Sequence, residues 1–350
     1  MTLDTATASP AAQPAPGELA RRRRRRWGLA AMTALLAVLL VLGLLVGSRM
    51  FGLVETVQAV FTDNGDAHVI VTGQRLPRTV LAVLVGAALA VAGALMQAQT
   101  RNPLADPGLF GVSSGAAFAI VVAALVLPGA GPWVLIWVAF AGAVLATVAV
   151  YLIGTAGGRG SSPLTLILAG VAIGAFLSGV GTTLEILFSG ALRAGRLWAA
   201  GNLDGHGWSG VLLVLPFLLV GVLLAALASH GLNAEGLGSD LATALGSDRR
   251  RTRDLVVVSV TLLAGSATAV VGVIFFVGMM VPHAARWITG PDQRWILAYC
   301  LLMGPILMLA ADIVGRVIVS PDEVPAGLVT AFLGAPVLIA MARRTRISGL

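Results

Sequence analysis

The feature that most restricts the fold of this chain is a succession of long apolar runs. The run Thr79–Ala98 contains no charged residue, and about 20 such residues suffice to cross a bilayer as a helix. It is rich in Gly and Ala, which let neighbouring helices approach closely. It begins after the basic turn Arg75-Leu-Pro-Arg78 and ends in a polar, proline-broken loop, 99–111. We expect helical spans near 27–50, 79–98, 111–127, 133–154, 164–188, 209–229, 255–274, 275–289, 295–314 and 326–342.

Composition supports a membrane protein. Hydrophobic residues make up 57% of the 350-residue chain and charged residues only 11%, whereas soluble domains carry about 25% charge. The sequence therefore predicts an all-α polytopic membrane protein with about ten transmembrane helices. Cys300 is the single cysteine, which excludes an internal disulfide and a cysteine-based metal site.

The absence of lysine excludes a P-loop ATPase within this chain. All 23 basic residues are arginine, and a P-loop needs a Lys that reaches the nucleotide phosphates. If transport by this chain is driven by ATP, a separate polypeptide has to supply the ATPase.

Arginine positions predict the orientation. Residues 1–26 are expected to form a disordered, basic cytoplasmic tail, followed by a transmembrane domain over 27–346. The run Arg21–Arg26 adjoins the first span, which favours a topology anchor on anionic lipid over a nucleic-acid site. The apolar run that follows is longer than a signal-peptide core. Ten spans place the basic clusters 249–253 and 343–346 on the same side as the N-terminus, as the positive-inside rule requires, whereas nine do not.

Three connecting segments are long enough to hold structure. Segments 51–78 and 189–208 lie outside in this topology, and 230–254 lies inside. Glycines at 231, 236, 238 and 246 divide the inside loop into two short helical pieces. A hydrophilic loop of this kind suits a surface that contacts a cytosolic partner.

Several motifs in the same order resemble the FecCD family of ABC-importer permeases, which move ferric siderophores, haem or vitamin B12. They are RLPR with GAALAVAGALMQ, RNPLADPGLFGVSSGA, Gly201-Asn202-Leu203, LGSDLATALG, GVIFFVGMMVPHAARW and LAADIVGR with VPAGLVTAFLGAP. The likeness covers nearly everything from Arg75 to Arg343. Asn202 departs from the Gly or Ser often found there, and the Arg-rich N-terminus is unusually long.

The resemblance implies a type II importer fold and a set of partners. Two permease subunits, identical or different, would surround one path in the bacterial cytoplasmic membrane, with both termini of this chain in the cytoplasm. Two cytosolic ATPase subunits would bind inside and an extracytoplasmic substrate-binding protein outside, with no cofactor held by this chain and no nucleic acid. The ligand would be a ferric siderophore, with haem or vitamin B12 as alternatives.

The resemblance also implies roles for single residues. Arg75, Arg78 and Arg316 would dock the binding protein, and Asn102, Pro103 and Leu104 would form the inner gate. The ATPase-coupling residues within 230–254 would be Leu232, Asn233, Leu237, Gly238, Ala242, Leu245 and Gly246.

Plainer interpretations stand beside these. Contact with lipid headgroups is the alternative for the outer arginines, although docking is favoured, and Asp312 with Arg316 suits an i,i+4 ion pair within the membrane. We expect Glu185 to be a helix-end carboxylate and His283 a packing residue, while Met96 and Gln97 fit either the path or the core. We interpret spans 79–98 and 164–188, with the helices that pack on them, as walls of the path. Other classes are an ion-driven secondary transporter, which needs ionisable residues at mid-membrane, and a membrane enzyme, which needs a cluster of His, Asp or Glu.

Overall fold

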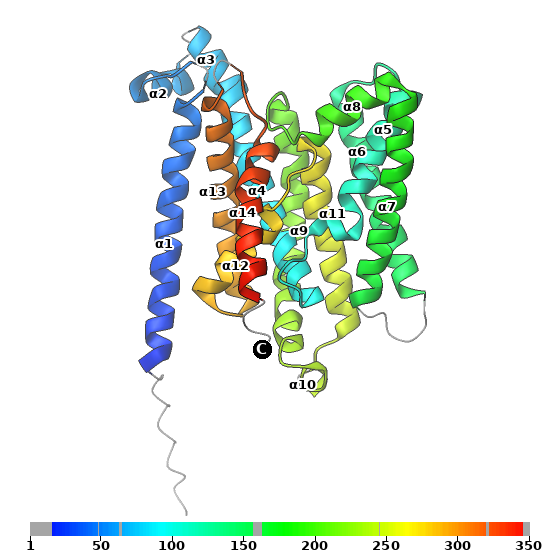
Figure 1. Cartoon of the computed structure of the whole chain (residues 1–350). Coiled ribbons are helices and arrows are strands. Elements are labelled where there is room, and N and C mark those ends of the chain that lie inside the picture. The colour runs from blue at the N-terminus through cyan, green and yellow to red at the C-terminus, as the bar shows by residue number, and fades with distance from the viewer. Residues whose placement is uncertain are drawn as a thin grey trace, which may run out of the picture.

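The computed structural model describes residues 16–47, 49–62, 65–156, 163–244, 246–319 and 322–345. Every regular element in these ranges is a helix (Figure 1). The elements are α1 (Pro16–Leu45), α2 (Leu53–Phe61), α3 (Asp66–Ile70), the π-helix η1 (Val71–Arg75), α4 (Leu76–Thr100), the 3₁₀-helix η2 (Pro107–Phe110), α5 (Val112–Val126), α6 (Pro132–Thr155), α7 (Pro163–Leu187), α8 (Ser189–Ala199), α9 (Gly207–Glu235), α10 (Ser239–Ala244), α11 (Arg249–Val271), α12 (Val277–Thr289), α13 (Gln293–Val317) and α14 (Ala326–Thr345).

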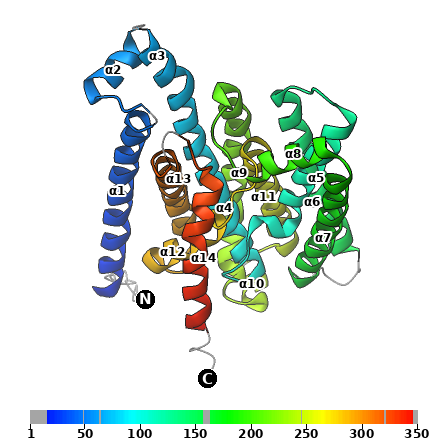
Figure 2. The same ribbon diagram turned by 45° about the horizontal axis from the view of Figure 1, so that its top comes forward.

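The long helices run roughly side by side, and the short ones gather at the two ends of the bundle (Figure 1). Helices α2, α3 and α8 lie at one end, which we call the α8 end. Helix α10, the start of α1 and the end of α14 lie at the other, the α10 end. Helix α1 stands at one edge of the bundle in both views, and α7 stands at the opposite edge (Figure 2).

Helix α4 is the core of the bundle. It packs against α9, α11, α12 and α13. In the most apolar stretch of 18 residues within Asp66–Thr100, 89% is buried. Small residues permit this density, because a side chain at Gly86 would overlap the backbone of Gly304, and one at Gly93 would overlap that of Gly278. The expectation that Gly and Ala serve close helix packing is thus confirmed at α4.

Seven helices of the described residues are long and apolar enough to cross a membrane. They are α1, α4 with the segment before it, α6, α7, α9, α11 and α13. Helix α5 and residues Ala326–Ala340 of α14 are apolar but shorter, and α12 has only 13 residues, or about 20 Å at 1.5 Å per residue. The chain is therefore a multi-pass helical protein, and the count of ten spans stays a prediction.

Two non-helical segments set where α5 and α12 begin. The chain leaves helical geometry over 272–276, with positive φ at Gly272 and Phe276, so the predicted spans 255–274 and 275–289 are instead α11 and the shorter α12. The loop after α4 leads into η2, where Pro107 lies against Gly278 of α12. Non-helical backbone at this depth is tolerated where protein covers it, and Ala105, Pro107, Phe110 and Gly272 are buried.

The expectation of a disordered tail over residues 1–26 was wrong in part. Residues Pro16–Arg26, predicted as part of a disordered tail, are the first turns of α1, while residues 1–15 lie outside the described residues. Arginine has high helix propensity, and Arg24 and Arg25 donate to the carbonyl oxygens of Ile288 and Thr289 at the end of α12. Segment 51–78 is also helical for most of its length, in α2, α3 and η1.

Candidate functional site at the two ends of the bundle

A buried ion pair joins α4 to α13 near the α8 end. The Nε of Arg78 donates to Oδ1 of Asp312 at 3.0 Å, and Oδ2 of Asp312 accepts from Nη2 of Arg316 one helical turn later. Asp312 is 1% exposed and Arg316 2% exposed. The predicted i,i+4 pair between Asp312 and Arg316 is therefore present, and Arg78 is its third member.

Two more carboxylates reach Arg78 from connecting loops. Nη1 of Arg78 donates to Oε2 of Glu323 at 2.6 Å, and Oδ1 of Asp204 lies 3.5 Å from the same nitrogen. Glu323 precedes α14, and Asp204 precedes α9. The side chain of Asp204 is 58% exposed and that of Glu323 is 32% exposed, so Arg78 is covered from outside by two carboxylates that water can reach.

The loop that carries Asp204 is held by turns of its own. The Oδ1 of Asn202 accepts from the backbone N–H of Asp204, and a ring nitrogen of His206 lies 3.1 Å from the Asn202 carbonyl oxygen. Burial lowers the pKa of the His206 imidazole below its usual range. The ring is therefore neutral at pH 7 and leaves the Asp204 charge free to face Arg78.

Arg75 and Arg316 bind the end of α1. Arg75 donates to the carbonyl oxygens of Leu44, Leu45 and Arg49, and its guanidinium lies 4.7 Å from the centre of the Phe51 ring. Arg316 donates to the carbonyl oxygens of Gly43 and Val46. Cations are favourable at the C-terminal end of a helix, where carbonyl groups lack partners, so these arginines fix α1 to the bundle.

The α8-end network, which is Arg75, Arg78, Arg316, Asp204, Asp312 and Glu323, bears on the predicted docking role. All three arginines are buried, and three carboxylates balance their charges. Arg78 is the member of the network with two partners that water reaches, Asp204 and Glu323. Docking by the three arginines stays a prediction, to which the structure adds a role inside the chain.

The predicted inner gate lies at the α10 end, where α4 stops. Asn102, Pro103 and Leu104 are exposed, and Oδ1 of Asn102 accepts from the backbone N–H of Leu104 at 2.9 Å, which forms a tight turn. Arg101, in the left-handed conformation with φ 51°, donates from Nη2 to the Glu235 carbonyl oxygen at 2.7 Å. The gate segment is thus bonded to the last residue of α9.

The predicted coupling segment is divided between α9 and α10. Helix α9 continues to Glu235, and α10 follows between Gly238 and Gly246, whose φ values are 110° and 73°. Leu232 and Ala242 are buried and so support the segment from within. Leu237 and Leu241 are 63% and 58% exposed, which makes them an apolar surface at the α10 end. Leu245 lies outside the described residues.

Asn233 fastens the end of α9 to the start of α13. Its Nδ2 donates to Oδ1 of Asp292 at 3.1 Å, and its Oδ1 accepts from the backbone N–H of Gln293 at 2.8 Å. Arg101 and Asn233 together make the end of α9 a junction between the gate segment, α13 and α10.

Sequence reasoning missed four residues of these two regions. Asp204 and Glu323 meet Arg78 from far along the chain, so no local spacing reveals them. Arg101 precedes the gate motif directly, and an arginine just past a helix end was the available signal. Leu241 was visible as a leucine in an otherwise hydrophilic loop.

Met96 and Gln97 on α4, which fit either the path or the core by sequence, belong to the core. Met96 and Gln97 are buried, and Nε2 of Gln97 donates to the Met279 carbonyl oxygen at 3.0 Å. The interpretation of this span as a wall of the path is therefore wrong for the chain by itself, because four helices enclose α4. Helix α7, in contrast, exposes apolar side chains along its length, among them Leu164, Leu168, Val171 and Phe176.

Among the described residues, no group of three or more His, Cys, Asp or Glu side chains is placed to hold a metal ion. His283 packs edge-on against Trp287, with ring centroids 4.8 Å apart, as expected for a packing residue. Cys300 is buried.

A bundle of long apolar helices with its charges near the two ends belongs to the class of polytopic membrane proteins. The profile of the FecCD transport family matches residues 35–344, and the chain belongs to this family. It is 45% identical over 316 residues to the ferric enterobactin transport system permease protein FepD of Escherichia coli, covering 90% of this chain and 94% of the relative.

Other relatives differ in their ligands. The Fe(3+)-citrate import system permease protein YfmD of Bacillus subtilis is 39% identical, with 87% of this chain and 91% of the relative covered. The vitamin B12 import system permease protein BtuC of Yersinia enterocolitica is 41% identical, with 82% and 84% covered. A solved inward-facing structure described as a metal-chelate type ABC transporter has a TM-score of 0.80 at 27% identity, covering 90% of this chain and 98% of that one.

Proposed function

We propose that this chain is the permease subunit of an ABC importer that takes up a ferric siderophore across the bacterial cytoplasmic membrane. The ferric enterobactin and ferric citrate relatives support the ligand class. The observation that carries the mechanism is the hydrogen-bonded junction at the end of α9. It lies between the exposed leucines Leu237 and Leu241 and the gate segment.

In this proposal the α10 end is cytoplasmic, and both termini lie there. The α10 end holds Arg23–Arg26, Arg101, Arg249–Arg253, Arg294 and Arg343, and the positive-inside rule places such arginines in the cytoplasm. Two ATPase subunits contact Leu237 and Leu241, and their closure displaces α10. The displacement passes through Glu235 and Arg101 to Asn102, Pro103 and Leu104, which open or close the inner end of the path.

The substrate-binding protein docks at the α8 end in this proposal. Its carboxylates exchange with Asp204 and Glu323 at Arg78, and they also meet Arg193 and Arg196, which are exposed on α8. Exposed ion pairs contribute about 0.2–1 kcal/mol each. Several of them set orientation and association rate more than tight affinity, which suits a partner that departs in each cycle.

The path forms between two permease subunits. Helix α7 leaves most of its apolar surface uncovered within this chain. In its most apolar stretch of 18 residues, only 22% is buried. A second copy or a homologous subunit facing α7 encloses a path that neither subunit encloses alone. Selectivity then belongs to the binding protein, and the permease needs no tight site for the chelate.

An ion-driven secondary transporter is the second candidate. It requires ionisable residues near mid-membrane. In the described helices that are long enough to cross, the charged side chains, such as Glu185, Asp254 and Asp312, lie near helix ends. The arrangement therefore favours the ATP-driven importer.

The ligand is tested by uptake in a bacterial strain lacking this gene. Complementation with the chain should restore uptake of a radiolabelled ferric siderophore, while labelled haem and cobalamin enter at the rate of the uncomplemented strain. Restoration of cobalamin or haem uptake alone would overturn the siderophore assignment.

A further inference from the structure

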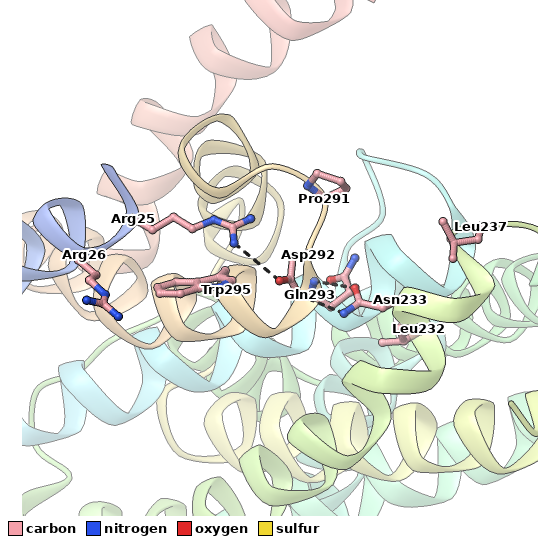
Figure 3. A pocket seen from close by; sticks show the side chains of 10 residues that line it. Arg25, Arg26, Leu232, Asn233, Leu237, Pro291, Asp292, Gln293 and Trp295 are labelled. Atoms are coloured by element: carbon pink, nitrogen blue, oxygen red, sulfur yellow. Dashed lines mark hydrogen bonds and ion pairs between the residues drawn. The ribbon is translucent and has the colours of Figure 1, made fainter. Parts of the chain in front are cut away.

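A cleft of about 920 Å³ opens at the α10 end between α1, the start of α13 and the end of α9 (Figure 3). Arg25, Arg26 and Trp295 lie on one side of it, and Asn233 and Leu237 lie on the other. The cleft separates the basic start of α1 from the junction described above. None of its basic residues has a role in the transport cycle proposed here.

The one acidic side chain of the cleft is already satisfied. Oδ1 of Asp292 accepts from Nδ2 of Asn233 and from the backbone N–H of Arg294, both at 3.1 Å. Its Oδ2 lies 3.8 Å from Nη1 of Arg25. Arg25 in turn stacks 5.1 Å from the centre of the Trp295 ring and donates to the Thr289 carbonyl oxygen. The Asp292 carboxylate is therefore paired with Arg25 and with two N–H donors.

Arg26 is left without a counter-charge. Its side chain lines the cleft and is exposed, and within the residues that the structure describes no hydrogen bond or ion pair reaches it. Its neighbours on the same helix, Arg23 and Arg24, are exposed as well. The cleft is thus a preformed hollow with a free guanidinium, an aromatic wall and an excess of positive charge, which fits an anionic group.

The position of the cleft identifies the anion. Arg25 and Arg26 lie in the first turns of the membrane-crossing part of α1, Arg23–Leu45, and Trp295 lies in the first turn of α13, Gln293–Val317. Both therefore sit at the level of lipid headgroups, where Trp is enriched and where anionic phospholipids attract basic segments. We propose that this cleft binds the phosphate headgroup of one anionic phospholipid, with Arg26 as its main cationic contact.

A bound headgroup touches both sides of the cleft. Arg26 holds it from α1, and Leu237 and Asn233 border it from the coupling segment. The lipid then fixes the distance between α1 and the junction at the end of α9, so membrane composition affects how far that junction moves. The binding itself does not depend on the proposed transport function, and it is measured separately.

The test is native mass spectrometry of the purified full-length chain in detergent, titrated with phosphatidylglycerol or phosphatidylcholine. The wild-type chain should retain one phosphatidylglycerol and no phosphatidylcholine. Arg26→Gln should weaken this retention roughly fivefold, the loss expected for one arginine near anionic lipid, and Arg26→Glu should weaken it further. Arg23→Glu is the matched control, because it makes the same charge change on the same helix outside the cleft, and it should weaken retention much less than Arg26→Glu does.

Other results overturn the proposal. Equal retention by the wild type, Arg26→Glu and Arg23→Glu would show that the cleft holds no headgroup. Displacement of the lipid by an equal concentration of soluble glycerol phosphate would assign the site to a free anion instead. Unchanged retention, combined with loss of ATPase association in Arg26→Glu, would assign the cleft to a protein partner. Thermal unfolding of each variant should match the wild type, since neither arginine side chain is bonded within the described residues.

Discussion

The carboxylate of Asp312 lies 3.0 Å from Nε of Arg78, and both side chains are buried although 234 residues separate them. The pair joins the two helices that pack most extensively in the core, α4 and α13. Removing one member of a buried pair leaves the other charge uncompensated. The α8 end is therefore held by a buried ion pair in addition to helix packing.

Replacing Asp312 should destabilise the chain strongly. Asp312→Asn leaves Arg78 and Arg316 short of one negative charge, which costs about 3–5 kcal/mol for a buried pair. The measurement is thermal or denaturant unfolding in detergent. Asp322→Asn, on an exposed residue of the neighbouring loop, is the control and should leave stability unchanged. Equal stability of the two variants would contradict the role of the pair.

Close backbone packing predicts opposite effects at two helical glycines. Gly93→Ala puts a methyl group into the Gly278 carbonyl of α12, and overpacking of this kind costs about 1–3 kcal/mol. Gly179→Ala on α7 meets nothing within 4 Å and should gain up to about 1 kcal/mol in helix propensity. Unfolding of both variants in the same detergent gives the comparison. A neutral Gly93→Ala would argue against the packing of α4 on α12.

Loss of the Arg101 contact should uncouple ATP hydrolysis from uptake. A hydrogen bond from a charged donor contributes about 1.5–3 kcal/mol, so Arg101→Asn should lower uptake per ATP hydrolysed roughly tenfold. Asparagine tolerates the left-handed backbone at this position, which keeps the turn. Arg101→Lys is the control, since lysine can still donate to the Glu235 carbonyl. Full coupling in Arg101→Asn would remove this contact from the mechanism.

Docking at the α8 end is tested more cleanly at exposed arginines than at buried ones. Arg75→Glu with Arg78→Glu should abolish uptake stimulated by the binding protein, but it also breaks internal bonds and so should lower stability. Arg193→Glu with Arg196→Glu changes exposed residues of α8 and should slow association of the binding protein, most clearly at low salt, without changing unfolding. An association rate equal to wild type in that second variant would place docking elsewhere on the α8 end.

How far the sequence predicts the structure depends on whether contacts are local. Apolar runs locate the long helices because each run satisfies its own backbone, and the i,i+4 spacing of Asp312 and Arg316 is enough to predict their pair. Contacts of Arg78 with Glu323 and of Arg101 with Glu235 depend on how helices are arranged, so no local pattern shows them. The same reason applies to α4, whose composition predicts a wall of the path but suits any tightly packed helix. Only its neighbours show that it is enclosed.

The central claim is that this chain supplies a path and a coupling surface while a separate ATPase supplies the energy. The most direct test is uptake of a radiolabelled ferric siderophore into proteoliposomes that contain the chain, its binding protein and its ATPase. Uptake should require both ATP and the ATPase, and it should fall to the background rate when the ATPase is omitted, even with a proton or sodium gradient imposed. Gradient-driven accumulation without the ATPase would contradict the claim.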